Sequence, residues 1–257
     1  TCAIMLKKQV RRGINERIGH HLLLAGQGKQ ALIPLLQGIW EREEAGEYQV
    51  LGPMLKAWER ELHRLNLSFG HPYWGEVWIL KSRFARGTGD YQTSFQMASY
   101  AHRDAKKQKW LRISSQSLTL MGDAAFRGGM DEEDSLNWLL EGEQEAEKVA
   151  DPNLLGGARW TVGDFLCYQG KWSQAAHYFQ KALDDYTEAR NQLGMGNAHY
   201  GLARVARQAE LFEDARQHLD IALVHCEMSS SQRGIADILS TKGDIYRMEG
   251  NLDLAED

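Results

Sequence analysis

Apolar side chains recur along most of the chain at intervals of three and four residues, with polar positions between them. This spacing is typical of amphipathic helices, because residues three and four apart lie on one helix face. No segment sustains the two-residue alternation of a half-buried strand. Only four of the 257 residues are proline, which permits long helices. The pattern therefore predicts an all-α protein.

Pairs of glycines seven residues apart punctuate this pattern. They are Gly19 and Gly26, Gly122 and Gly129, Gly163 and Gly170, and Gly243 and Gly250. The first glycine of each pair falls within an expected helix, where it costs about 1 kcal/mol relative to alanine. We expect it to allow a second helix to pack closely. The second glycine falls at a turn, where it can adopt a positive φ at the helix C-terminus.

A second periodic feature follows each turn. A small residue comes first, an apolar residue follows four positions later, and a small or apolar residue comes three after that. These sets begin at Ala31, Leu51, Ser94, Ser135, Ala175 and Ala215, and Ala255 lies 40 residues after the last of them. A unit repeated about every 40 residues predicts an array of helix pairs, in which each pair buries its apolar face against its neighbours.

The helix pairs resemble tetratricopeptide repeats (TPRs), whose signature includes Gly-x2-Tyr in the first helix and Ala-x3-Phe in the second. Gly243–Tyr246 carries the former and Ala175–Phe179 the latter, whereas Ala203 replaces the mid-helix glycine of one repeat. The resemblance implies a right-handed α-solenoid of about six helix pairs. It predicts a regular array over residues 67–257 and irregular helical repeats over residues 1–66. In the irregular part, Pro34 should start, kink or interrupt a helix.

Residues 17–36 also resemble the junction that opens a helical repeat array in large bacterial signalling ATPases (STAND ATPases). The chain does not begin with Met, and it ends at Asp257, where the second helix of a repeat should begin. Both features predict a piece of a larger bacterial regulator. We expect the helix 231–249 to lack its usual cover, leaving Leu239, Ile245 and Tyr246 partly exposed. A second copy of the chain could cover this end and form a homodimer.

Composition and motifs argue against catalysis. The sequence has no phosphate-binding Gly-x4-Gly-Lys-Ser/Thr, no Gly-x-Ser-x-Gly and no His-Glu-x2-His. We therefore expect a non-enzyme without cofactor or metal. A net charge of −5 disfavours nucleic acid as a partner, and no apolar run approaches the ~18 residues of a membrane span. The three cysteines, Cys2, Cys167 and Cys226, favour a reducing, cytoplasmic compartment.

Other clusters have simpler explanations than a site. His20–His21 and His225–Cys226 lack further ligands at metal spacing. The acidic residues of 131–147 and the basic tract Arg103–Arg112 fit solvated helix surfaces better than binding sites. Asp131 and Asp151 stand where helix N-caps are expected, and Pro152 suits a first helical position.

The TPR resemblance implies that the first helices of the pairs line a concave groove for a protein segment. Helical spacing places these candidates on that face: Arg83, Arg86, Asp123, Arg127, Trp160, Asp164, Tyr168, Asn197, Tyr200, Arg204, Arg207, Asp244 and Arg247. One equivalent position carries a charge of either sign, in Arg83, Asp123, Asp164, Arg204 and Asp244. Aromatic side chains beside arginine are enriched at interfaces. For any single residue, a solvated surface position is the alternative.

The leading hypothesis is a non-catalytic scaffold that binds a protein or peptide in this groove, as the sensory or docking arm of a larger regulator. One alternative is a small-ligand sensor, which would need an enclosed pocket. Another is a phosphatase-like or enzyme-regulating TPR protein, which would need convergent acidic or amide groups with perturbed pKa values.

Overall fold

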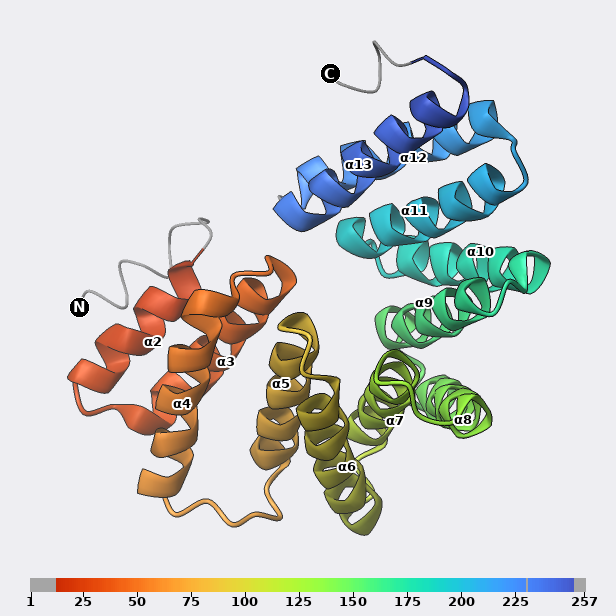
Figure 1. Cartoon of the computed structure of the whole chain (residues 1–257). Coiled ribbons are helices and arrows are strands. Elements are labelled where there is room, and N and C mark those ends of the chain that lie inside the picture. The colour runs from red at the N-terminus through yellow and green to blue at the C-terminus, as the bar shows by residue number, and fades with distance from the viewer. Residues whose placement is uncertain (1–12, 230, 252–257) are drawn as a thin grey trace. The chain divides into compact units, whose positions relative to one another are not determined.

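The computed structural model describes residues 13–229 and 231–251, and all regular secondary structure in these ranges is α-helical (Figure 1). The prediction of an all-α fold is confirmed. The chain forms two compact units, one ending at Ile113 and the other beginning at Ser114. No helix in the described ranges is both long enough and apolar enough to cross a membrane.

Unit 1 contains five helices and the start of a sixth. They are α2 (Ile14–Leu24), α3 (Gly28–Glu44), α4 (Tyr48–Arg64), α5 (Pro72–Gly87), α6 (Tyr91–Gln108) and the first residues of α7 (Leu111–Arg127). Consecutive helices pack together from α2 to α6, and α3 additionally contacts α5. Thus α3 is at once the partner of α2 and the first helix of a pair with α4.

Pro34 lies inside α3 and neither starts nor interrupts it, so that part of the expectation was wrong. A proline removes the hydrogen bond to the carbonyl four residues earlier, here that of Gln30. Gln30 is exposed, so water can satisfy its carbonyl. Ala31 and Leu35 meanwhile bury the adjoining side of the helix. Burial of that face outweighs the missing bond.

Unit 2 contains the remaining helices. They are most of α7, α8 (Glu132–Val149), α9 (Pro152–Tyr168), α10 (Trp172–Glu188), α11 (Gln192–Gln208), α12 (Phe212–Met228) and α13 (Gln232–Met248). We call α7, α9, α11 and α13 the A helices and α8, α10 and α12 the B helices. Consecutive helices pack together from α8 to α13, and α11 also contacts α9 and α13. The expected beginning of another B helix lies at 252–257, outside the described residues.

The glycine pairs that begin at Gly122 and Gly163 act as predicted. A Cβ added at Gly122 would lie 2.6 Å from Leu139 Cγ, and one at Gly163 would lie 2.8 Å from Phe179 Cε1. Real Cβ atoms do not approach so closely, so these helices touch only because glycine has no side chain. The turn glycines Gly26, Gly129, Gly170 and Gly250 all have positive φ, between 69° and 79°.

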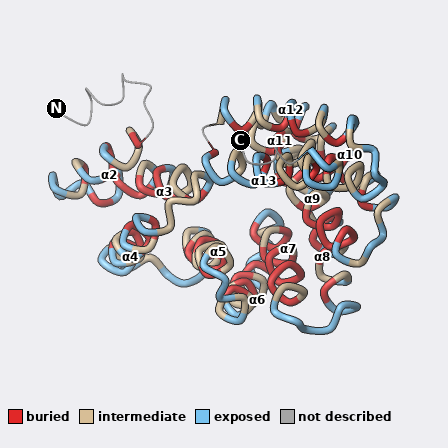
Figure 2. The backbone as a smooth tube through the Cα atoms, turned by 45° about the horizontal axis from the view of Figure 1, so that its top comes forward, coloured by how far each residue is buried: buried red, intermediate tan, exposed pale blue. Residues whose placement is uncertain are grey.

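Burial follows the faces where helices meet (Figure 2). Leu139, Val162, Phe165, Phe179, Leu219 and Ile245 are buried, and Leu202 and Tyr246 are half-buried. Leu239 is 53% exposed as expected, but the expectation that Ile245 is uncovered was wrong. Ile245 belongs to a cluster with buried Leu219 of α12, which already covers it.

The predicted helix starts are also confirmed. Asp131 accepts hydrogen bonds from the backbone N–H groups of Glu133 and Asp134. Asp151 does the same for Asn153 and Leu154, and Pro152 follows it at the first helical position. Each carboxylate satisfies N–H groups that have no partner within the helix.

Candidate functional site

An ion-pair ladder joins the A helices of unit 2. Asp164 of α9 accepts a hydrogen bond of 2.6 Å from Arg127 Nη2 of α7 and one of 2.5 Å from Arg204 Nη1 of α11. Arg127 Nε also donates to Asp123, four residues earlier, at 2.7 Å. One buried carboxylate therefore links three successive A helices.

The acidic and basic groups of the ladder differ in burial. Asp123 is 2% exposed and Asp164 is 4% exposed, whereas Arg127 and Arg204 keep part of their side chains in solvent. Burial opposes the charge of Arg204, but Asp164 outweighs it, so the pKa of Arg204 lies above its ordinary value. The opposite charges of Asp164 and Arg204 at equivalent positions thus form a contact between neighbouring repeats. The buried carboxylates stabilise the packing between helices, whereas the arginine side chains remain partly accessible to solvent.

A second cluster joins α11 to α13. Arg207 Nη1 lies 3.4 Å from Asp244 Oδ2, and Arg247 also pairs with Asp244. The hydroxyl groups of Tyr200 and Thr241 lie 3.3 Å apart. The side chain of Asp244 is 41% exposed, so these ion pairs are weaker than the buried ladder. This end of the surface keeps more accessible charge.

The predicted aromatic residues differ in their availability. Trp160 Nε1 donates 3.0 Å to the backbone carbonyl of Asn197, which ties α9 to α11. Tyr168 is 71% exposed, and its ring contacts that of Phe126 edge-on at 4.7 Å between centroids. Tyr168 is therefore a large apolar group held in place yet open to solvent.

Eleven of the thirteen predicted groove residues lie in unit 2, and we call the surface that they form the A-helix face. Arg83 and Arg86 lie on α5 of unit 1 instead. Arg83 Nη2 lies 2.8 Å from Glu43 Oε2 of α3, and its guanidinium sits 5.3 Å from the centroid of the Trp40 ring. Arg83 thus links α5 to α3 in the way that the ladder links A helices in unit 2.

Two arrangements were not predicted from the sequence. Arg159 of α9 pairs with Glu143 of α8 at 3.1 Å and with Asp185 of α10 at 2.9 Å. The Nδ1 atoms of His199 and His218 lie 3.0 Å apart. Burial, with smaller contributions from His218 and His225, lowers the pKa of His199 to about 4. Helical spacing identifies residues on one element, whereas these clusters combine side chains from two or three.

The cysteines offer no activated nucleophile. Burial raises the pKa of Cys167 to about 11, so its thiol is protonated near neutral pH. Burial also raises the pKa of Cys226. Within the described residues, no group of three or more His, Cys, Asp or Glu side chains is placed to hold a metal ion. Cys2 lies outside those residues.

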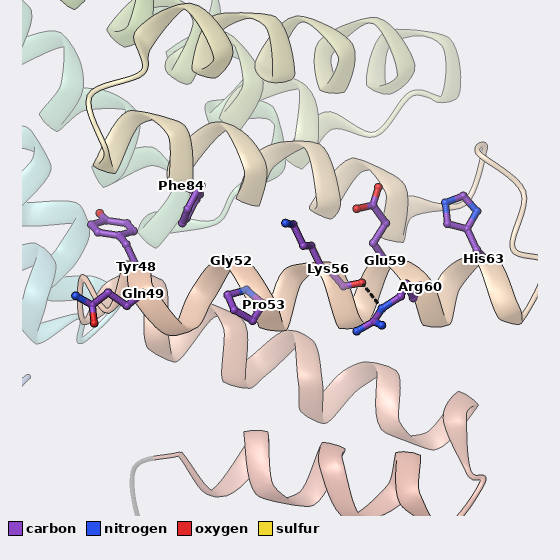
Figure 3. Close-up of a pocket in the computed structure, with 9 residues that line it drawn as sticks. All are labelled: Tyr48, Gln49, Gly52, Pro53, Lys56, Glu59, Arg60, His63 and Phe84. Atoms are coloured by element: carbon purple, nitrogen blue, oxygen red, sulfur yellow. Dashed lines mark hydrogen bonds between the residues drawn. The ribbon is translucent and has the colours of Figure 1, made fainter.

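A groove on unit 1 was not predicted either. It has a volume of about 880 Å³ and runs along α4, with Phe84 of α5 at one end (Figure 3). Tyr48 lies beside Phe84, while Lys56 and Glu59 point from α4 toward α5. Its residues carry no TPR signature, so only the folded structure reveals it.

Comparison with known families matches this geometry. Residues 155–223, which cover α9 to α12 in large part, match the family model for the tetratricopeptide repeat. This segment is therefore similar to TPRs, as predicted. A comparison with curated protein sequences found no significant match.

Solved structures share the fold at low sequence identity. A Signal Transduction ATPase with Numerous Domains (STAND) protein with a TPR sensor, from Pyrococcus horikoshii, is 14% identical with a TM-score of 0.62. The match covers 95% of this chain and 40% of that one. Aspartyl phosphate phosphatase F from Bacillus subtilis is 13% identical, with a TM-score of 0.61 over 98% of this chain and 74% of that one. A Rap protein complexed with Competence and Sporulation Factor is 11% identical, with a TM-score of 0.64 over 99% and 75%.

These identities establish similarity of fold alone. The chain spans well under half the length of the STAND protein. The matched family describes a repeat and not a catalytic domain, and such repeats commonly serve as interaction scaffolds.

Proposed function

We propose that this chain is a non-catalytic scaffold that binds a segment of a partner protein on the A-helix face of unit 2. The observation that carries the proposal is the ion-pair ladder. Asp164 holds Arg127 and Arg204 in fixed orientations while leaving them partly in solvent. Prepositioned arginines lose less entropy on binding than free ones, and they recognise carboxylates and backbone carbonyls well.

Tyr168 adds an apolar anchor to this surface. It is exposed at the end of α9, and its contact with Phe126 limits its motion. Binding energy concentrates on aromatic and arginine side chains at interfaces. The partner segment that fits carries an apolar side chain for Tyr168 and acidic or carbonyl groups for Arg204 and Arg207.

Photo-crosslinking tests the proposal even though the partner is unidentified. Benzoylphenylalanine replaces Tyr168 in one variant and Gln180 in a control, because Gln180 is exposed on the B helix α10. We expect crosslinking in host cells to a defined partner from position 168 and not from 180. Mass spectrometry then identifies the crosslinked peptide.

A charge variant sharpens this test. Arg207→Glu should abolish the crosslink from position 168, whereas Arg190→Glu, at the end of α10, should leave it intact. Equal crosslinking from positions 168 and 180, or a crosslink insensitive to Arg207→Glu, would contradict the proposal.

We also propose that this scaffold is the sensory or docking arm of a larger bacterial regulator. The structural likeness to a STAND protein with a TPR sensor supports this placement. Reading the gene around the chain for an upstream ATPase segment tests it directly. The small-ligand and phosphatase-like alternatives give different results, namely a ligand retained in native mass spectrometry or turnover of an acyl phosphate by the purified chain.

A further inference from the structure

The groove of unit 1 exists because two residues of α4, Gly52 and Pro53, carry little or no side chain on the helix surface. Gly52 has no side chain, and a Cβ added there would lie 3.6 Å from the Phe84 ring, an ordinary contact distance. Pro53 follows and presents only its compact ring to solvent. Unlike Gly163, Gly52 is not filled by the neighbouring helix. Its missing side chain leaves open space.

The charges along the groove are unbalanced. Glu59 Oε1 accepts from Lys81 Nζ of α5 at 2.8 Å, so its charge is neutralised. Lys56 and Arg60 are exposed and have no acidic partner in the described part of the chain. Arg60 Nε makes a 3.4 Å contact with the backbone carbonyl of Lys56. The groove therefore has a net positive charge on a protein whose overall charge is −5.

The other end of the groove is aromatic. The rings of Tyr48 and Phe84 meet edge-on with 6.2 Å between centroids. Gly87 lets the Tyr48 ring lie close to α5, because a Cβ there would overlap Tyr48 Cζ. Both side chains are half-buried. The pair forms a fixed apolar wall at one end, opposite in character to the basic part.

The length of the groove indicates the form of its occupant. Tyr48 and His63 both line it, and at about 1.5 Å per residue α4 covers roughly 22 Å between them. An extended peptide covers that distance with roughly six or seven residues. Lys56 and Arg60 lie about 12 and 18 Å from Tyr48 along the helix, which corresponds to roughly four and six residues of extended peptide.

We propose that this groove binds an extended acidic peptide segment with one aromatic or large aliphatic side chain. The apolar side chain packs against Tyr48 and Phe84, and two carboxylates pair with Lys56 and Arg60. Charge complementarity selects the acidic segment, and the aromatic wall fixes its register. This site is separate from the A-helix face and needs none of its residues.

Fluorescence anisotropy with a defined probe tests the proposal. The probe is a fluorescein-labelled peptide of sequence Phe-Ser-Gly-Ser-Glu-Ser-Glu, used together with a peptide of reversed order because either direction can fit. Matched controls replace both Glu by Gln, or Phe by Ser. We expect saturable binding of at least one acidic probe at low ionic strength, and about tenfold weaker binding of each control. Binding should weaken further as salt rises.

Variants locate the binding. Lys56→Glu with Arg60→Glu should weaken binding at least about tenfold, because attraction becomes repulsion. Lys106→Glu with Lys107→Glu changes the same charge at exposed positions of α6 and should have no effect. Gly52→Leu keeps all charges and should block the groove. Circular dichroism verifies that each variant is folded.

Three outcomes would overturn the proposal. One is absence of binding by either acidic probe. Another is equal loss of binding in the α4 and α6 charge variants. The last is competition by a short single-stranded DNA as effective as the unlabelled peptide, which would indicate a general anion surface. None of these outcomes bears on crosslinking at Tyr168, so the two proposals fail independently.

Discussion

Units 1 and 2 use similar repeats but treat their charges differently. In unit 2, buried Asp164 neutralises arginines from the A helices on both sides of it. In unit 1, α4 leaves Lys56 and Arg60 without an acidic partner in the described chain. The same helical architecture can therefore hold its cations with a buried carboxylate or leave them without an acidic partner.

Glycine shows the same contrast. Gly163 lies against the Phe179 ring and allows α9 and α10 to touch, whereas Gly52 lines the groove, where a Cβ would make only an ordinary contact with Phe84. A glycine in a helix thus has two uses, close packing or an empty surface, and only its neighbours distinguish them. Substitutions at the two positions should have opposite effects on stability.

The largest effect is expected for Gly163→Leu. Its Cβ alone would overlap Phe179, which has no free space because a Cβ at Gly201 of α11 would lie only 2.7 Å from the same ring. We expect a loss of about 3 kcal/mol in unfolding free energy, at the upper end of the usual cost of overpacking. Urea unfolding followed by circular dichroism measures this. An unchanged midpoint would contradict the assigned contact between α9 and α10.

A smaller loss is expected for Asp164→Asn. This change removes the carboxylate that Arg127 and Arg204 share, and breaking a buried pair usually costs about 3–5 kcal/mol. Both arginines reach solvent, so we expect about 2 kcal/mol. The same change at exposed Asp244 should cost under about 1 kcal/mol. If the two variants unfold at the same urea concentration, the ladder does not stabilise unit 2.

Acid should weaken unit 2 through the histidine cluster on α11 and α12. The folded protein holds His199 neutral with a pKa of about 4, against an ordinary value of 6.5. Between these values the unfolded chain binds a proton that the folded one does not, so unfolding free energy falls as pH decreases from 6.5 to about 4. Because the ring is partly solvated, we expect a loss of about 1 kcal/mol.

Hydrogen exchange at neutral pH and near pH ~5 measures this effect by segment. Peptides from α11 and α12 should lose protection at the lower pH, and His199→Gln should remove that change. His177→Gln, at an exposed position of α10, serves as the control. Retained pH sensitivity in the His199 variant would assign the effect to other groups.

The smallest effect is a gain. Gly52→Ala adds a Cβ at an ordinary 3.6 Å from Phe84 and raises the helix propensity of α4. We expect stabilisation by about 0.5 kcal/mol, measured by thermal unfolding. A destabilised variant would show that Gly52 is a packing glycine like Gly163, and the distinction between the units would fail there.

The repeat pattern predicted most of the fold because turns and helix caps depend on residues close together in the sequence. Gly170 with its positive φ and Asp151 with its cap bonds both follow from short-range geometry. Pro34 could not be placed correctly, because burial of the adjoining side of α3 decides its effect. That burial depends on helices far away in the sequence.

The candidate sites were likewise predictable only in part. The opposite charges of Asp164 and Arg204, one repeat apart, were visible in the sequence, but their contact with each other was not. Whether a charge faces a partner or the next repeat depends on side-chain reach between helices. The groove at Lys56 could not be recognised in the sequence. Its empty space depends on how the side chains of α4 and α5 pack after folding.

The ion pairs of Asp164 constrain how such an array can grow. Suppose that the repeat formed by α9 and α10 were copied in tandem, as repeats are when genes duplicate. The two copies of Asp164 would then occupy adjacent positions, with Arg127 beside the first copy and Arg204 beside the second. Each carboxylate would pair with one arginine instead of two, and the direct link between three A helices would be lost. The repeat that carries Asp164 is thus not interchangeable with its neighbours, because only a single copy between Arg127 and Arg204 can hold both arginines.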